Sequence, residues 1–498
     1  MKPVITPVPW LTAALVLLAA TTQAQTYTNL YAFSNYGFDS ANGSATNNDG
    51  AELYGGLVLS SNVLYGAAWE GGTNGNGTVY AVNTDGSGFR VLHTFGPPYV
   101  TYGGINSDGA FPHDTLALGD NVLYGTTTEG GTNGYGTVFR LNTDGTSFMC
   151  LHSFSLGSDG INPNAGLLLS GNTLYGTASY GGAGSGAGAV FELNTNGTGY
   201  KLLHSFGGGS NDGGFPNGGL VLSGGTLYGT SSSGGALGRG VVFALSTNGT
   251  GNGSGYTNLY VFTGTNSPYA ITTNNNGETP ISGLTLSGNT LYGTTTHGGT
   301  NSNGIIFSIE TNGMNFLNLY TFSATTNSYN PTNSDGADPL GALFLSDGVL
   351  YGTALGGGTN AEGTVFAINT DGTGFKTLYN FIPIEVFVGP NLYSYGGDGP
   401  EDGVILSSNT LYGTTFYGGN IDGNVFALIL SSSTPTVIPI PLNVQVSGRT
   451  LLLDWNSSGF SLQSASSVGG PYTNVPAATS PYIVSPTNSQ QFFRLQAN

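Results

Sequence analysis

Carboxylates recur at matching places along this chain of 498 residues. An Asp followed by Gly precedes one short apolar run after another, in pieces such as NDGA and SDGA. These residues are Asp49, Asp108, Asp159, Asp212, Asp335 and Asp398. A loop carboxylate accepts backbone N–H bonds and fixes a turn, whereas a ring of carboxylates also suits Ca²⁺. Because the spacing of an EF-hand loop is absent, we expect a structural role, with calcium as the alternative and no other cofactor.

A second set of residues differs where the surrounding sequence repeats. The residue before each Gly-Gly pair is Glu, Tyr, Ser, His or Gly, so the fold does not dictate its type. Aromatic faces beside carboxylates suit sugars, whose C–H faces stack while their hydroxyls donate hydrogen bonds. The candidate ligand-binding residues are Trp69, Glu70, Glu129, Tyr180, His297, Phe416 and Tyr417. The alternative is free drift of an exposed position.

Two of these residues raise the question of catalysis. Glu70 and Glu129 hold equivalent positions in neighbouring copies of a repeat, and a pair of carboxylates is what glycoside hydrolysis uses. Duplication alone also produces such a pair. No G-x-S-x-G, H-E-x-x-H or phosphate-binding loop occurs. His93, His152 and His204 share one place with Tyr of other copies, which indicates packing. We therefore predict no catalytic residue and keep a carbohydrate-active hydrolase or lyase as the alternative.

Copies of one unit must position these residues. The triplet Leu-Tyr-Gly begins at Leu64, Leu123, Leu174, Leu227, Leu291, Leu350 and Leu411. Each copy holds four apolar runs, typified by GLxLS, LYGTTT, GTVFxLN and LHSF or LYxF. The runs are short, rich in β-branched and aromatic residues and bounded by Gly or Asn, as strands are. Pieces such as NTDG between the third and fourth runs supply the tight hairpin turns.

Four antiparallel strands in each of seven units predict an all-β fold, a seven-bladed β-propeller. A β-solenoid is the alternative, but its coils are usually shorter and need no hairpins. The seventh unit lacks the fourth run, and an extra copy, NLYAF, stands at 29–33. If that run is the outermost strand, the N-terminal strand completes the last blade and hides a sheet edge.

The repeated pattern LYGTTxxGGxxxxGTVFxLNTDGxGFxxLHSF resembles the GloVer-type tandem repeat of secreted bacterial proteins with varied C-terminal anchors. The resemblance covers roughly residues 26–430. It implies an extracytoplasmic location. It brings no activity, cofactor or catalytic residue with it.

The two ends of the chain differ from the repeats. Lys2, the apolar run at 10–20 and TQA before Gln25 form a secretory signal, and the run is too short to span a bilayer as an anchor. After the last repeat, a Ser/Pro/Thr linker leads to apolar runs that resemble a small fibronectin-type-III module with Trp455 in its core. We expect a signal peptide (1–24), a propeller (25–430), a linker (431–442) and a β-sandwich-like module (443–498).

Charge narrows the class of partner. Lys and Arg number 8 against 26 Asp and Glu, so the formal net charge is −18 and the surface repels nucleic acid and anionic lipid. The single Cys150 allows no internal disulfide, and no later segment is apolar enough to span a membrane. We expect a secreted or cell-surface monomer that binds a glycan or an envelope protein. A purely structural surface protein is the other possibility.

Overall fold

The computed structural model describes most of the chain from residue 25 onward, and every structural statement here concerns those residues. The described ranges are 25–34, 37–39, 44–96, 105–157, 159–183, 186–249, 254–263, 274–326, 331–388, 391–395, 399–418, 422–431, 443–447, 450–454, 460–465, 473–475, 478–479, 481–484 and 492–497. The predicted signal peptide (1–24), Asp398, Trp455 and nearly all of the predicted linker lie outside them.

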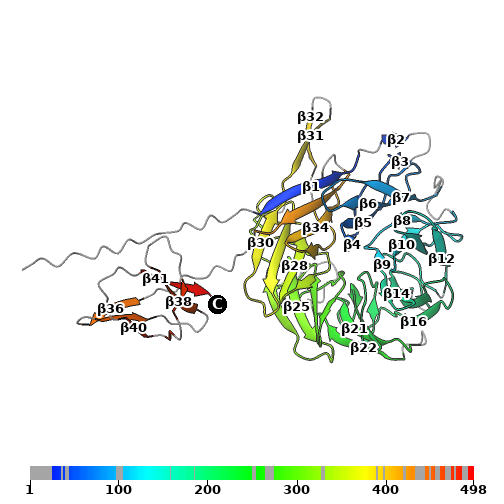
Figure 1. The fold of residues 1–498 in the computed structure, drawn as a ribbon. Coiled ribbons are helices and arrows are strands. Elements are labelled where there is room, and N and C mark those ends of the chain that lie inside the picture. Colours follow the sequence, from blue (N-terminus) through cyan, green and yellow to red (C-terminus); the bar gives the residue numbers. More distant parts are fainter. Residues whose placement is uncertain are drawn as a thin grey trace, which may run out of the picture. The chain divides into compact units, whose positions relative to one another are not determined.

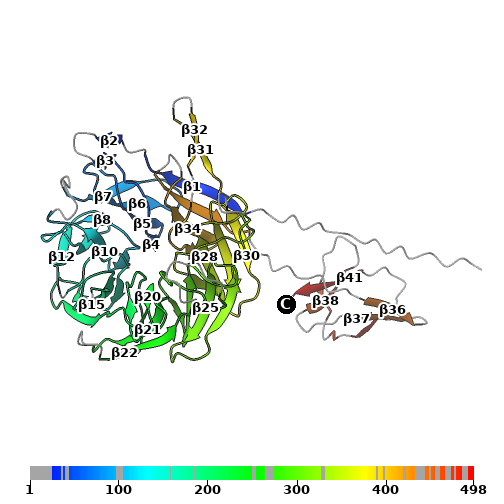
Figure 2. The ribbon, with the colours of Figure 1, turned by 180° about the vertical axis from the view of Figure 1, so that it is seen from behind.

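Seven antiparallel sheets form a ring of blades, each built on four strands and one of them, in blade 2, carrying a fifth, which confirms the predicted propeller (Figures 1 and 2). From the innermost strand outward they are blade 1, β4 (Val58–Ser60), β5 (Val63–Ala68), β6 (Thr78–Asn83) and β7 (Arg90–Thr94); blade 2, β9 (Ala117–Gly119), β10 (Val122–Glu129), β11 (Thr137–Asn142) and β12 (Met149–Ser153); blade 3, β13 (Leu168–Ser170), β14 (Thr173–Ala178), β15 (Ala189–Asn194) and β16 (Lys201–Ser205); blade 4, β18 (Val221–Ser223), β19 (Thr226–Ser231), β21 (Val241–Ser246) and β22 (Tyr256–Val261); blade 5, β23 (Thr285–Ser287), β24 (Thr290–Thr295), β25 (Ile305–Glu310) and β26 (Leu317–Thr321); blade 6, β27 (Phe344–Ser346), β28 (Val349–Ala354), β29 (Thr364–Asn369) and β30 (Lys376–Asn380); and blade 7, β33 (Ile405–Ser407), β34 (Thr410–Thr415), β35 (Asn424–Ile429) and β1 (Thr26–Ala32).

The apolar core lies between the blades. Seven hydrophobic clusters each join residues of two adjacent blades, including the interface between blade 7 and blade 1. The Phe that ends each fourth run is fully buried there, as Phe95 is against Phe139 of the next blade, with ring centroids 5.3 Å apart. Burying such a ring contributes about 1.5–3 kcal/mol, so the repeated Phe binds neighbouring blades together.

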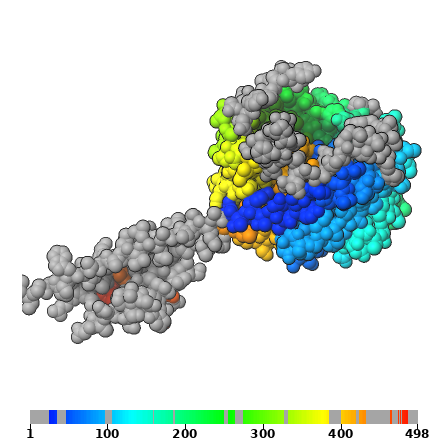
Figure 3. All heavy atoms as spheres, turned by 90° about the horizontal axis from the view of Figure 1, so that it is seen from above, coloured from blue at the N-terminus to red at the C-terminus, as the bar shows by residue number. Residues whose placement is uncertain are grey.

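The N-terminal strand closes the ring, as the sequence predicted. β1 pairs with β35, from Thr26 opposite Ile429 to Ala32 opposite Asn424. The register shift in this pair lies at the same place as in the third and fourth strands of the other blades. In the space-filling view of Figure 3, β1 (dark blue) runs along the outer surface between orange and lighter blue segments. β1 is therefore a full equivalent of the fourth strands.

An aromatic stack repeats between the outer strands of successive blades. The His or Tyr of each fourth run lies flat on an aromatic ring of the next blade. The stacked pairs are Tyr31–Phe89, His93–Phe148, His152–Tyr200, His204–Tyr256, Tyr260–Phe316, Tyr320–Phe375 and Tyr379–Tyr27. Tyr27 and Tyr31 both belong to β1. Without this strand, two of the seven stacked pairs would each lack one ring.

Further strands occur at the crossings, which are the chain segments that lead from the outermost strand of one blade to the innermost strand of the next. Short hairpins are formed by β2 (Gly37–Asp39) with β3 (Ser44–Thr46) and by β31 (Ile384–Val388) with β32 (Asn391–Tyr395). In blade 2, β8 (Ala110–Pro112) adds to β10, and in blade 4, β17 (Gly213–Gly214) pairs with β20 (Ser233–Gly234). Across the described ranges there is no helix of the length and apolar character that a membrane crossing needs.

The chain divides into two compact units, with residues 24–430 in the propeller unit. In the other unit, β36 (Asn443–Ser447), β37 (Thr450–Asp454) and β40 (Tyr482–Val484) form one sheet, and β38 (Phe460–Ala465), β39 (Thr473–Asn474) and β41 (Phe492–Ala497) form another. Leu453, Leu462 and Val484 are buried. The sequence did not single out β36 and β40, and the resemblance to a fibronectin-type-III module stays a prediction.

Candidate ligand site at the rim of the central cavity

Backbone pairing places the crossings and the variable loop residues on one face of the ring. Ala51 in the crossing before blade 1 pairs with Glu70, at the end of β5. The same pairing joins Ala110 to Glu129 and, in blade 5, joins the crossing to His297. This pairing fixes the main chain at these positions, so only the side chains differ from blade to blade.

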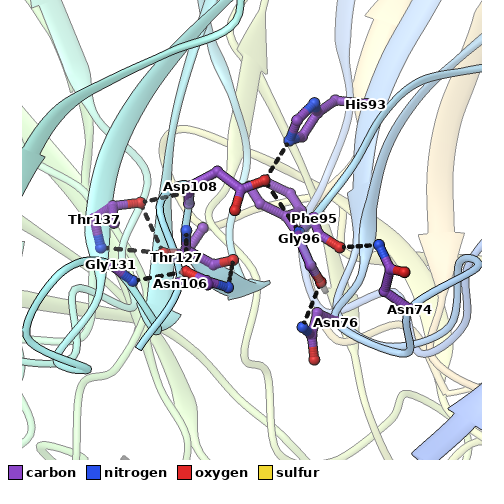
Figure 4. A network of polar contacts seen from close by, with 11 residues as sticks. Asn74, Asn76, His93, Phe95, Gly96, Asn106, Asp108, Thr127, Gly131 and Thr137 are labelled. Carbon is purple, nitrogen blue, oxygen red and sulfur yellow. Dashed lines mark hydrogen bonds and ion pairs between the residues drawn. The ribbon is translucent and has the colours of Figure 1, made fainter. Parts of the chain in front are cut away.

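The Asp residues of the crossings, which we call the outer carboxylates, accept hydrogen bonds from the preceding blade. The described members are Asp49, Asp108, Asp159, Asp212 and Asp335. Asp335 accepts bonds from the Tyr320 hydroxyl at 2.7 Å, the Ser323 N–H at 2.9 Å and the Ser323 hydroxyl. Asp108 accepts bonds from the Gly96 N–H at 3.0 Å and lies 3.1 Å from His93 Nε2, as Figure 4 shows. Each carboxylate thus fixes the chain where it leaves an outermost strand.

The same arrangement recurs in the other described members of this set. Asp49 accepts bonds from Tyr31 and from both the N–H and the hydroxyl of Ser34. Asp159 and Asp212 face His152 and His204. Of the histidines interpreted from sequence as packing residues, His93 and His204 therefore also hydrogen-bond to crossing carboxylates, and His152 Nε2 lies 3.3 Å from Asp159. Within the described ranges no three His, Cys, Asp or Glu are grouped to hold a metal ion, Asp398 lies outside those ranges, and calcium stays a prediction.

A central cavity of about 610 Å³ runs along the innermost strands of all seven blades. Its wall contains one apolar residue from each blade, nearly all of whose surface is buried: Leu57, Leu116, Leu167, Leu220, Leu284, Leu343 and Val404. Three residues before each of these, at the face of the crossings, stands a residue that also lines the cavity. We call these the rim residues: Tyr54, His113, Asn164, Asn217, Ile281, Leu340 and Glu401.

The rim residues divide the cavity into unlike sectors. Blades 7, 1 and 2 supply a carboxylate, a phenol and an imidazole, in Glu401, Tyr54 and His113. Blades 3 and 4 supply amides, and blades 5 and 6 supply the aliphatic Ile281 and Leu340. Because the main chain repeats around the ring, this difference comes from the side chains alone. A ligand here meets a polar aromatic side and an apolar side.

An aromatic cluster surrounds Tyr54 in the sector of blades 7, 1 and 2. The ring of His113 stacks on it with centroids 4.7 Å apart, and Phe416 lies at 4.6 Å. Trp69 meets it edge to face at 5.4 Å, and Tyr417 meets Phe416 at 4.4 Å. Tyr417 keeps 39% of its surface exposed, so the cluster presents an aromatic face to solvent.

Two carboxyl groups beside this cluster, those of Glu70 and Glu401, have raised pKa values. Burial, together with the charges of Glu52 and Asp422, raises the pKa of Glu70 to about 7. Burial and the charge of Asp402 raise the pKa of Glu401 to about 7. Near neutral pH both side chains therefore exist partly as acids that donate a hydrogen bond and partly as carboxylates that accept one.

The imidazole at the rim is held neutral. Burial lowers the pKa of His113 to about 4, and its Nδ1 lies 3.1 Å from the Asn164 carbonyl oxygen. A backbone carbonyl only accepts, so Nδ1 carries the proton and Nε2 is left as an acceptor. Burial and the charge of Glu52 also raise the pKa of Tyr54 far above its ordinary value, so its hydroxyl stays protonated.

The structure brings together four of the seven residues proposed from sequence. Trp69, Glu70, Phe416 and Tyr417 gather around Tyr54. The other three lie in other blades: Tyr180 lines the cavity and meets Phe215 edge to face at 5.2 Å, His297 lies near Asp338, and Glu129 pairs with Ala110 through its backbone. The charged groups that act on Glu70 are Glu52 and Asp422 rather than Glu129.

Sequence reasoning missed the rim residues themselves, including Tyr54, His113 and Glu401. A signal for them exists. When the seven copies are aligned on the Leu of GLxLS, the position three residues earlier shows Tyr, His, Asn, Asn, Ile, Leu and Glu. Such variety beside a residue that is Leu in six copies and Val404 in the seventh marks a position where the ring leaves the side chain free.

Comparison with known proteins identifies the repeat family. The profile of the Gloeobacter/Verrucomicrobia repeat family matches residues 99–277, 188–334 and 269–390, which together span more than half of the chain. The search of curated protein sequences found no match to this chain.

Among solved structures the similarity is low. A chain of the nidogen/laminin complex is 15% identical with a TM-score of 0.33, and the match covers 52% of this chain and 76% of that one. TolB from Acinetobacter baumannii is 15% identical with a TM-score of 0.35, covering 59% and 58%. PorZ, a bacterial surface component of the type-IX secretion system of Porphyromonas gingivalis, is 13% identical with a TM-score of 0.44, covering 91% and 60%. At these TM-scores none of the three indicates a ligand for this chain.

Proposed function

This chain belongs to the Gloeobacter/Verrucomicrobia repeat family, and from that premise we propose that it is a secreted or cell-surface binding protein that recognises a glycan. The binding site in this proposal is the sector of blades 7, 1 and 2 at the rim of the central cavity. The protein acts by recognition rather than by chemistry.

One observation carries the proposal: side chains suited to a sugar gather in one sector of an otherwise repetitive ring. Tyr54, Trp69 and Tyr417 supply aromatic surface, and Glu70 and Glu401 supply groups that both donate and accept hydrogen bonds near neutral pH. Pyranose rings stack on aromatic faces through their C–H groups while their hydroxyls bond to such neighbours. The equivalent sector of blades 5 and 6 carries aliphatic rim residues instead.

Binding to a broad array of polysaccharides tests the proposal, with Tyr417→Ala and Trp69→Ala as site variants. We expect each to weaken binding about tenfold, the effect of losing about 1.4 kcal/mol of stacking. His297→Ala is the matched control, because His297 stands at the position equivalent to Tyr417 but outside the aromatic cluster. It should leave affinity unchanged.

Three other outcomes separate the remaining possibilities. If no glycan binds but an envelope protein does, and Tyr417→Ala abolishes that binding, the same site recognises protein. If a bound glycan is cleaved and Glu70→Gln with Glu129→Gln stops the cleavage while binding persists, the protein is a hydrolase or lyase. If neither class binds, the protein is a structural surface component and the proposal is wrong.

A further inference from the structure

Two Asp residues stand beside the cavity at a position where the other blades have a small residue. The position two residues before the wall residue (Leu57 and its equivalents, with Val404 in blade 7) is Gly, Ala or Ser in five blades, as in Gly55 and Gly218. In blades 2 and 7 it is Asp114 and Asp402, and both line the central cavity. The function proposed above makes no use of these two carboxyl groups.

The two carboxyl groups tie four consecutive blades together. Asp402 of blade 7 accepts hydrogen bonds from the Gly56 N–H of blade 1 at 2.7 Å and from the Thr115 hydroxyl of blade 2 at 2.6 Å. Asp114 of blade 2 accepts a bond from the Gly166 N–H of blade 3 at 2.6 Å. The side chains of Asp114 and Asp402 also lie within hydrogen-bonding reach of each other. Two carboxyl groups share a hydrogen bond only when a proton lies between them.

Blade 1 leaves room for this contact. A Cβ on Gly56 would lie 2.9 Å from Asp402 Oδ2 and 2.8 Å from the Thr115 hydroxyl oxygen. A Cβ on Gly55 would lie 2.6 Å from the main chain of Asp114. The absence of side chains at these two positions lets the carboxyl groups of blades 7 and 2 meet across blade 1.

The surroundings hold the pair in its protonated form. Burial and the charge of Asp402 raise the pKa of Asp114 to about 8, against the opposing backbone hydrogen bonds. The titratable groups that face the pair are His113 of blade 2, which stays neutral, Glu401 of blade 7 and Tyr54 of blade 1. Of the described residues that line the cavity, none is a Lys or Arg that would neutralise a second negative charge.

We propose that Asp114 and Asp402 form a proton-operated clamp, which holds blades 7, 1, 2 and 3 together at the cavity wall and releases them when the shared proton is lost. With both groups ionised, two like charges face each other in a partly buried site, and the bonds to Gly56 and Gly166 weaken as the side chains separate. His113 and Glu401 directly precede the two Asp residues, so release also shifts the rim. This last consequence rests on the proposed function.

Hydrogen exchange of the full chain without ligand tests the clamp. Exchange at Gly56 and Gly166 is compared about one pH unit below and above the pKa of Asp114, after correction for the intrinsic pH dependence of exchange. We expect protection of both N–H groups to fall about tenfold or more above that pKa. Gly240 and Gly304, whose N–H groups bond to backbone carbonyls in blades 4 and 5, are internal controls and should keep their protection at both pH values.

Substitution separates a proton effect from a packing effect. The amide of Asp114→Asn donates to Asp402 at every pH, so this variant should stay protected on both sides of the transition. Asp114→Ala removes the acceptor of the Gly166 N–H, so Gly166 should be unprotected on both sides, while Gly56, which bonds to Asp402, should stay protected on both. If this variant fails to fold, Asp402→Asn tests the shared proton instead and should behave like Asp114→Asn. Equal protection of the wild type at both pH values, or the same pH dependence in Asp114→Asn, would overturn the clamp.

Ligand binding then tests the coupling to the rim. Affinity for any glycan found on the array should fall in the wild type over the pH range in which protection is lost, and should stay constant in Asp114→Asn. If no glycan binds while the exchange transition is present, the proposed function fails and the clamp stands. If a glycan binds but exchange shows no transition, the clamp fails and the proposed function stands.

Discussion

The outer and inner carboxylates of this propeller are the same residue type in opposite surroundings. Asp335, in a crossing, is almost fully buried but is surrounded by a tyrosine hydroxyl, a serine hydroxyl and a backbone N–H. Asp114, at the cavity wall, also receives a backbone N–H but is faced by a second carboxyl group. Burial alone therefore does not decide the behaviour of an Asp, because its neighbours determine whether the charged form is favoured.

The difference gives the two regions opposite responses to pH. Burial works to raise the pKa of Asp212, but bonds from His204 and from two backbone N–H groups outweigh it, so the pKa lies below its ordinary value of 3.8. Its contribution to stability is present above that value and is lost as pH falls through the folded pKa. The pKa of Asp114 is raised, so its contribution is complete below 3.8 and is lost as pH rises through about 8.

The largest effect should come from removing an outer carboxylate. Asp335→Ala leaves the Tyr320 hydroxyl and the Ser323 N–H without their buried acceptor, and we expect a loss of about 3 kcal/mol in the free energy of unfolding. Urea denaturation measures this loss. Asp371→Ala is the control, since Asp371 accepts bonds from Thr373 in an exposed turn and should matter much less. Equal losses would mean that the crossing carboxylates do not fix the blades.

A smaller effect should separate charge from hydrogen bonding in the outer set. Asp212→Asn keeps an acceptor near His204 but carries no charge, so the variant should be less stable than the wild type at neutral pH. The gap should narrow as pH falls below the ordinary pKa of Asp212, because the wild type then loses its charge as well. Thermal unfolding across that range checks the trend, and a constant gap would contradict it.

Tyr80 offers a third case, a buried polar atom with neither partner nor opposing charge. Its hydroxyl is fully buried without a hydrogen bond, where the equivalent residues of the other blades are Phe. Tyr80→Phe should raise the free energy of unfolding by about 1 kcal/mol. The reverse change, Phe139→Tyr, should lower it. Urea midpoints measure both, and a loss of stability in Tyr80→Phe would show that the hydroxyl has a partner after all.

The smallest effect should come from removing calcium. The described crossing carboxylates already accept hydrogen bonds from the protein, so chelation should leave the melting temperature unchanged. A bound ion at 100 times its dissociation constant would add about 2.7 kcal/mol, which a thermal melt detects easily. Stabilisation by added Ca²⁺ that is lost in Asp108→Asn would instead make the outer ring a metal site.

Repetition explains why the fold was predictable from sequence. Each of the four apolar runs became a strand, and the absence of a fourth run in the last unit correctly indicated closure by NLYAF at 29–33. Tyr27 precedes Tyr31 by four residues, as Phe89 precedes His93, but its stacking on Tyr379 was not anticipated, because Tyr379 belongs to blade 6 near the other end of the array. Its role is visible only when the two ends of the propeller lie side by side.

The candidate site was predictable only in part, because it depends on which blades are neighbours in space. Tyr417 and Trp69 are far apart in sequence and meet around Tyr54 because blade 7 closes onto blade 1. Asp114 and Asp402 meet for the same reason, with the glycines of blade 1 between them. An alignment of the seven copies reveals the unusual residues, whereas their contact and their pKa values require the ring.

The closing strand also has a consequence for how the chain reaches this structure. Residues 26–32 leave the ribosome before any other part of the propeller, yet their partner, β35, ends at Ile429. Native pairing must wait for almost the whole array, and contacts so distant in sequence form slowly. Until then β1 lacks its strand partner and Tyr27 lacks Tyr379 and Phe426, so the strand is open to non-native pairing or to a chaperone. The β1–β35 pairing that closes the ring is thus among the last contacts that a nascent molecule makes.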